Sequence, residues 1–151
     1  MSDELYREGK LVSDNYKNIL RSQTNAAAIP AEVTVRYGVT VRRANLRNLP
    51  TGEGLFFYAS DRNFDALQET ALDPGEAVAI LHTSTNGYFY YVQAYNYRGW
   101  LSKFDVAETD RSTWLRYAEP KNFLTVVAKD YTLKADGLRF YFSRAPFAAG
   151  G

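Results

Sequence analysis

The sequence contains no cysteine and a single histidine, His82. Without a thiol, the chain has no disulfide framework, no thiolate metal site and no cysteine nucleophile. One histidine cannot build a multi-histidine metal site, and a lone histidine at a strand end is more often structural than catalytic. The G-x-S-x-G motif that would place a serine nucleophile is also missing. We therefore expect a non-enzymatic chain that needs neither metal nor cofactor.

The chain also has little net charge, with 18 basic and 17 acidic residues giving +1. A protein that neutralises many phosphates normally has a basic surplus, so we do not expect nucleic acid as a partner. The arginines that stand near aromatic residues alternate with valines, which is typical of the solvent face of a half-buried strand. They are Arg36, Arg42, Arg43 and Arg47.

Long hydrophobic runs are absent too. No stretch of about 18 apolar residues could span a membrane. The first residues, MSDELYREGK, are polar where a signal peptide needs an apolar segment. Either the protein is cytoplasmic or the chain begins downstream of a removed targeting segment, and the sequence alone leaves both open.

Aromatic residues, in contrast, are abundant: 12 Tyr, 9 Phe and 2 Trp. Tyrosine combines a large apolar body with a polar tip, so it serves wet interfaces as well as cores. In the strand predicted over 88–92, successive side chains point to opposite faces, so one set of aromatics faces away from the core. Those side chains are either covered by the chain's own terminal segments or exposed as a binding platform.

Residues 1–30 are predicted to form an arm with one short helix. Ser13 or Asp14 can cap it, and Pro30 follows as a stop signal. The apolar stripe is too small to fold alone, so it must dock on the rest of the chain. It consists of Val12, Tyr16, Ile19 and Leu20.

From residue 31 the apolar period changes to two, which indicates strands. The segment VTVRYGVTVRR predicts a strand with a possible break at Gly38, and a second strand runs through Val78 and Ile80. Asn86 and Gly87 predict a tight hairpin turn. We expect an all-β, small SH3-like barrel over 31–118, preceded by the helical arm over 1–30 and followed by a C-terminal β extension over 119–151.

Two features stand outside the strand pattern. Residues 55–69 form a long connection whose acidic side chains could serve a glycosidase, although capping of turns is the favoured interpretation. These carboxylates are Asp61, Asp65 and Glu69, with Asp73 just beyond. The segment DRSTWLRYAEP predicts one or two helical turns capped by Asp110.

Four segments carry a family resemblance, in the right order and spacing over residues 33–127. They are YGVTVRRANLRNLPT, FDALQETALDPGEAVAILHTS, YNYRGW followed by LSKFDVA, and RSTWLRYAEPKNFLTVV. Together they resemble the bacterial SH3 (SH3b) domain that precedes the catalytic domain in NlpC/p60-type cell-wall cysteine peptidases. The segment after Leu133 resembles the beginning of a second SH3b domain.

The resemblance implies a non-catalytic module of a secreted or envelope hydrolase that cuts peptidoglycan stem peptides. In that family the Cys/His chemistry belongs to a separate domain, which this chain lacks. The expected partners are peptidoglycan or its stem peptides and the neighbouring peptidase domain, whose substrate cleft the module helps to shape. The alternative is a protein–protein interaction module whose aromatic face docks a partner domain without binding cell wall.

Within this framework Gly99 and Trp100 are expected to be structural, with Trp100 entering the core. The predicted ligand-binding groove has one wall at the turn before them, formed by Tyr95, Asn96, Tyr97 and Arg98. The opposite wall is expected in the long connection, from Phe56, Phe57, Tyr58, Asp61 and Phe64. Tyrosine faces would pack on sugar rings or peptide backbone, and Arg98 or Asp61 would pair with a stem-peptide carboxylate or amine.

Overall fold

The N-terminal arm contains a small hairpin and a helix, as the computed structural model of residues 4–122 and 130–143 shows. Strands β1 (Tyr6–Arg7) and β2 (Lys10–Leu11) join through Glu8 and Gly9, which both have positive φ, as a tight two-residue turn requires. Helix α1 (Asp14–Ser22) follows, and the Ser13 hydroxyl accepts the amide N–H of Tyr16 at its start. A short 3₁₀ turn, η1 (Ala26–Ala28), ends the arm.

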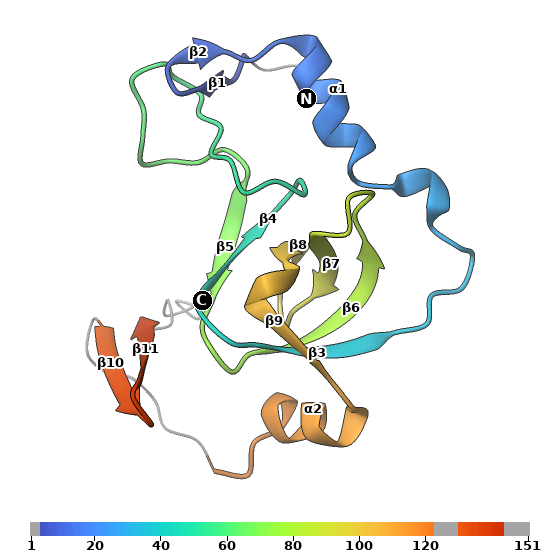
Figure 1. Cartoon of the computed structure of the whole chain (residues 1–151), viewed down its shortest axis with the longest axis vertical. Coiled ribbons are helices and arrows are strands. Elements are labelled where there is room, and N and C mark those ends of the chain that lie inside the picture. Colours follow the sequence, from blue (N-terminus) through green and yellow to red (C-terminus); the bar gives the residue numbers. More distant parts are fainter. Residues whose placement is uncertain (1–3, 123–129, 144–151) are drawn as a thin grey trace, which may run out of the picture.

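Seven antiparallel strands form the bent sheet of the SH3-like barrel, in the order β5-β4-β8-β7-β6-β3-β9 (Figure 1). The expected all-β class with a short helical arm is confirmed. Their bounds are β3 (Arg36–Thr40), β4 (Ala44–Arg47), β5 (Gln68–Leu72), β6 (Ala77–Thr83), β7 (Phe89–Gln93), β8 (Arg98–Ser102) and β9 (Val106–Thr109). The 3₁₀ turn η2 (Lys103–Asp105) links the last two.

One face of these strands supplies the barrel core, where Leu46, Val78, Ile80, Val92 and Leu101 are almost completely buried. Strand β3 passes through Gly38 without the break that we expected. A Cβ at that glycine would lie 2.5 Å from Val106 Cγ1, so the residue allows close packing of β3 on β9 rather than a bend. Gly99 has a similar role between β8 and β4, because a Cβ there would lie 2.7 Å from the Arg47 carbonyl oxygen.

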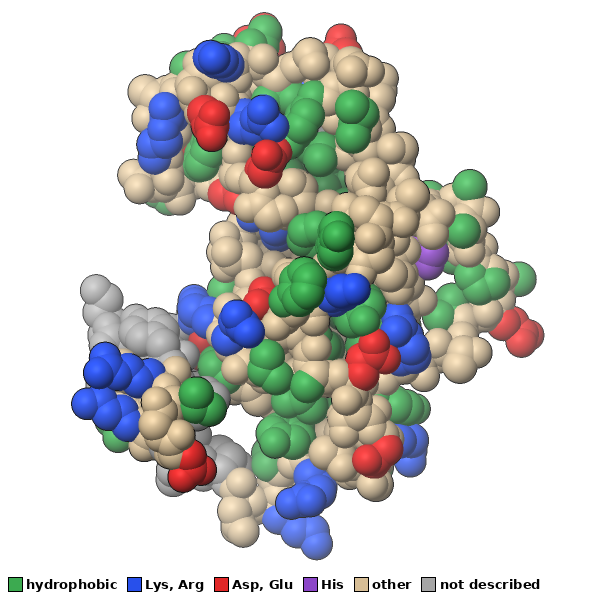
Figure 2. All heavy atoms as spheres, in the orientation of Figure 1, with side chains coloured by type: hydrophobic (Ala, Val, Ile, Leu, Met, Phe, Trp, Pro, Cys, Tyr) green, Lys and Arg blue, Asp and Glu red, His purple; other side chains and the backbone are tan. Residues whose placement is uncertain are grey.

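A second, separate core holds the arm against the long connection between β4 and β5. Leu5, Val12 and Leu20 from the arm pack with Leu55 and Leu67 from the connection. Ile19, which the predicted stripe included, is instead 48% exposed. These segments form a lobe at one end of the molecule, and Figure 2 shows the surface hollowed between this lobe and the barrel.

Helix α2 (Arg111–Ala118) lies at the other end of the barrel, below β3 in Figure 1. Beyond it, strands β10 (Asp130–Ala135) and β11 (Leu138–Ser143) pair in a two-stranded sheet of their own. Both strands fall within the predicted C-terminal extension over 119–151, of which residues 123–129 and 144–151 lie outside the described part of the chain.

Candidate functional site

The long connection is anchored by a buried ion pair. Arg47 at the end of β4 lies 2.6 Å from Asp65, and both side chains are at least 85% buried. The other Asp65 oxygen accepts the backbone N–H groups of Leu55 and Leu67, 3.1 and 3.0 Å away. A charged pair that is this well bonded fixes both ends of the connection to the barrel.

The middle of the connection turns around Asp61. Its carboxylate accepts the backbone N–H groups of Asn63 and Phe64, and these bonds lower the pKa of the Asp61 carboxyl, the Asn63 bond having the largest effect. The capping interpretation of these acidic residues is thus confirmed for Asp61 and Asp65. Three large rings on the segment that these carboxylates hold are exposed: Phe57 by 50%, Tyr58 by 72% and Phe64 by 78%.

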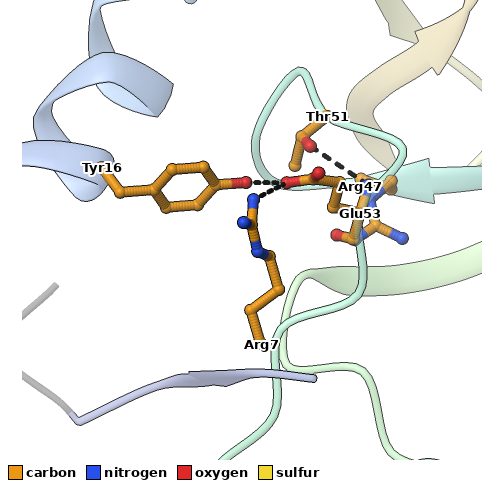
Figure 3. A network of polar contacts seen from close by, with 5 residues as sticks. All are labelled: Arg7, Tyr16, Arg47, Thr51 and Glu53. Carbon is orange, nitrogen blue, oxygen red and sulfur yellow. Dashed lines mark hydrogen bonds and ion pairs between the residues drawn. The ribbon is translucent and has the colours of Figure 1, made fainter. Parts of the chain in front are cut away.

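Figure 3 shows the polar contacts that tie the arm to the first part of the connection. The Arg7 guanidinium lies 2.9 Å from the Glu53 carboxylate and over the Tyr16 ring, and the Tyr16 hydroxyl donates to Glu53. These hydrogen bonds, the Tyr16 bond foremost, lower the pKa of the Glu53 carboxyl. Glu53 is also held through its backbone, which donates to Thr51 and accepts from Arg47.

The other predicted wall is the turn between β7 and β8. It is closed by the Ala94 N–H, which donates to the Tyr97 carbonyl, and by the Arg98 Nε, which donates to the Gln93 side chain. Tyr95 is 98% exposed, and Asn96, Tyr97 and Arg98 are exposed as well. The predicted turn residues therefore form a small accessible surface.

The structure does not bring the two walls into one groove, so that part of the prediction is wrong. The hairpin turn before β7 lies beside the end of α1, where the Thr85 N–H donates to the Gln23 carbonyl. The Tyr95 turn is at the opposite end of β7, next to α2, whereas the long connection packs with α1 and pairs Phe56 with Tyr6. The two aromatic groups thus lie at opposite ends of the barrel.

On the outward face of the aromatic strand, Phe89 and Tyr91 are half-buried, and the arm reaches this face at His82. The Tyr91 ring lies 5.3 Å from that of Trp100, which in turn lies 6.2 Å from His82. The His82 Nε2 contacts the Asn25 carbonyl oxygen of the arm at 3.0 Å. Trp100 is buried as expected, but on the outer face of the sheet rather than in the barrel core, because its neighbour Leu101 points into that core.

Sequence reasoning missed a cavity of about 440 Å³ beside α2. The Asp110 carboxylate caps this helix, and the Trp114 indole N–H donates to the Val78 carbonyl at 3.0 Å. This docking sets aromatic rings against the end of β6 and the Tyr95 turn. The spacing of Trp114 and Tyr117, three residues apart on a capped helix, was the signal available. The lining residues are Gly75, Glu76, Ala77, Ala79, Gln93, Ala94, Tyr95, Trp114, Tyr117 and Ala118.

The charged side chains of the barrel are largely used in pairs. Each of the four arginines that stand near aromatic residues contacts a carboxylate: Arg36–Glu108, Arg42–Asp105, Arg43–Asp73 and Arg47–Asp65. The expected solvent face is wrong for Arg47, which is buried. Within residues 4–122 and 130–143, no group of three His, Asp or Glu side chains could hold a metal ion. In the same residues, no helix is long and apolar enough to cross a membrane.

Comparisons with known proteins support the expected family. Residues 55–102 match the family model of the SH3 domain of the SH3b1 type. No curated protein sequence matches the chain. Among solved structures, the chain is similar to a novel NlpC/P60 endopeptidase from Photobacterium damselae subsp. piscicida, with a TM-score of 0.69 and 20% identity over 89% of this chain.

The matched part is 31% of that endopeptidase's chain, so this chain spans about a third of the structure that it resembles. At this identity the likeness establishes the fold, and the family model adds the SH3b type independently. The family model confirms the resemblance to an SH3b domain over residues 55–102, and the structural likeness confirms the fold.

Proposed function

We propose that this chain is a non-catalytic SH3b module of a cell-wall hydrolase and that it binds peptidoglycan in the cell envelope. The observation that carries the proposal is the exposure of Phe57, Tyr58 and Phe64 on one well-anchored segment. Exposed aromatic rings gathered in a monomer usually mark a surface that binds something. An SH3b-type sequence over 55–102 includes this segment and suggests what it binds.

The segment is suited to binding because it is already ordered. The Arg47–Asp65 pair and the Asp61 turn hold its backbone, so binding would carry little free-energy cost for ordering this segment. The rings would pack on the sugar or peptide backbone of the wall, and the Asp61 carboxylate, anionic at neutral pH, would pair with a stem-peptide amine.

The turn with Tyr95, Asn96, Tyr97 and Arg98 would provide a second contact at the far end of the barrel. There Arg98 would meet a stem-peptide carboxylate or an acidic group of a neighbouring domain. In a longer protein, one end of the barrel would shape the substrate cleft of an NlpC/p60 peptidase domain. We propose that the chain is divided into an arm over 1–30, the barrel over 31–118 and an extension over 119–151. The extension would be the beginning of a second SH3b domain.

The test is co-sedimentation of the purified chain with intact peptidoglycan sacculi. We expect the parent chain to be retained, and the triple variant Phe57→Ala/Tyr58→Ala/Phe64→Ala to lose about 10-fold in affinity. Tyr131→Ala is the matched control, because it removes an exposed ring from the separate β10–β11 sheet. A folded parent chain that stays in the supernatant would contradict the proposal.

A second candidate function is docking of a partner domain without wall contact. It is favoured by a further exposed pair, Tyr88 and Phe104, whose rings stack 6.1 Å apart while Lys103 lies over both. If the sacculi fail to retain the chain, this pair is the surface to test, by measuring binding of a separately expressed peptidase domain to Tyr88→Ala and Phe104→Ala variants.

A further inference from the structure

The cavity beside α2 is a second candidate site. It is formed by segments that lie far apart in the sequence and that no sequence pattern predicted to meet. Its walls are three aromatic side chains: Tyr95 from the β7–β8 turn, and Trp114 and Tyr117 from α2. Its floor is made of small residues, among them Ala77 and Ala79 of β6. A volume of about 440 Å³ falls in the usual range for pockets that hold small ligands.

The cavity is preformed because α2 is fixed from both sides. On one side, the Trp114 ring packs against Tyr37 with ring centroids 5.2 Å apart, and its indole N–H donates to the Val78 carbonyl. On the other, Tyr117 lies over Gly75, where even an added Cβ would only just touch the ring at 3.9 Å. The helix is therefore held against β3 and β6, with the cavity beside it.

The charged residues that line the cavity restrict the charge of a ligand that can bind there. Among its lining residues in the described part of the chain, Glu76 is the charged one, and none is Lys or Arg. Glu76 already accepts the Asp73 N–H at 2.9 Å, and its burial raises the pKa of its carboxyl. A stem peptide brings carboxylates of its own, which this environment repels and for which it offers no cation.

The polar side chains of the cavity are also largely satisfied. Gln93 donates to the carbonyl of Ala94 and accepts from Arg98, so its amide is occupied. What the walls offer is flat aromatic surface, together with the hydroxyl groups of Tyr95 and Tyr117. Such amphipathic rings suit a neutral ligand that has an apolar face and polar edges.

We infer that this cavity binds a neutral pyranose ring of a glycan strand, with Tyr95, Trp114 and Tyr117 against its faces. This inference rests on the proposed function and narrows it, because it places a sugar ring in the cavity itself, beside the turn where Arg98 would meet a stem-peptide carboxylate. The long connection with Phe57, Tyr58 and Phe64 remains the surface for the peptide-bearing part of the wall.

The test is a titration of the full chain with a peptide-free chitin tetrasaccharide, followed by tryptophan fluorescence and calorimetry. Trp114 lines the cavity, whereas the second tryptophan, Trp100, is buried against Tyr91 and His82 and does not line it, so binding at the cavity changes the Trp114 signal. We expect saturable binding that Tyr95→Ala weakens about 5-fold. Tyr131→Ala is the matched control, because it removes an exposed ring from the separate β10–β11 sheet, and Tyr131 does not line the cavity.

Three results would overturn the inference: no saccharide binding by the parent chain, equal binding by Tyr95→Ala, or a stem tripeptide that produces the same Tyr95-dependent signal. Sacculus retention is scored separately. If sacculi retain the chain while the tetrasaccharide gives no signal, the glycan assignment fails and the wall module stands. If sacculi do not retain the chain either, the proposed function fails with it.

Discussion

At the scale of single residues, the Arg47–Asp65 pair makes the clearest prediction. Arg47→Ala would leave the Asp65 carboxylate buried without its cation, which typically costs about 3–5 kcal/mol of unfolding free energy. Arg42→Ala is the control, because Arg42 is 66% exposed in its contact with Asp105 and such pairs contribute about 0–1 kcal/mol. Urea unfolding of both variants measures the difference, and equal losses would contradict this role for Arg47.

The contact between arm and barrel in Figure 3 predicts a pH dependence. Hydrogen bonds from Tyr16 and Arg7 lower the pKa of Glu53, so its ionised form is preferred in the folded protein. The stabilisation is therefore present above the ordinary Glu pKa of 4.5 and is lost as the pH falls through the lowered value. We expect Glu53→Gln to destabilise the chain at neutral pH and to do so less near pH 3, below the ordinary value.

Unfolding midpoints at the two pH values check this. A Glu53→Gln effect that is the same at both would mean that the charge of Glu53 has no part in holding the arm.

At the scale of elements, the approach of β8 to β4 depends on Gly99. Gly99→Ala would place a Cβ 2.7 Å from the Arg47 carbonyl and 2.9 Å from Leu46 Cγ, and overpacking of this kind costs about 1–3 kcal/mol. Gly52→Ala is the matched control, because a Cβ there would meet nothing within 4 Å. If Gly99→Ala unfolds at the same urea concentration as Gly52→Ala, the two strands do not need the glycine.

Helix α2 is expected to depend on its cap. The Ser112 hydroxyl and the Thr113 N–H donate to Asp110 and lower its pKa to about 2. The cap therefore stabilises α2 above the ordinary Asp pKa of 3.8 and is lost only as the pH falls through about 2. We expect Asp110→Ala to speed amide hydrogen exchange over Arg111–Ala118, and Asp110→Asn, which can still accept the bond, to do so much less.

At the scale of the whole molecule, local signals predicted most elements and long-range ones did not. The caps at Ser13 and Asp110, the Asn86–Gly87 turn and the all-β class follow from residues that are close in sequence. The β1–β2 hairpin was missed because its strands are two residues long and Glu8 occupies a left-handed position without glycine's freedom.

The predicted groove failed for a different reason. Strand order and the docking of the arm decide which turns lie at the same end of the barrel. Local sequence patterns predict neither of them. The cavity beside α2 was missed likewise, since Ala77, Tyr95 and Tyr117 meet only after the helix packs on β6. Trp100 lies on the outer face because side chains alternate along β8 and its neighbour Leu101 fills the barrel core.

The most direct test of the account is an amide-resolved NMR titration of the chain with soluble peptidoglycan fragments that carry both sugar and stem peptide. The account predicts saturable shifts in two groups, one over residues 57–64 and one at the cavity around Tyr95 and Tyr117. Shifts confined to Tyr88 and Phe104, or no shifts at all with the chain folded, would contradict it and point to a module that docks a protein domain.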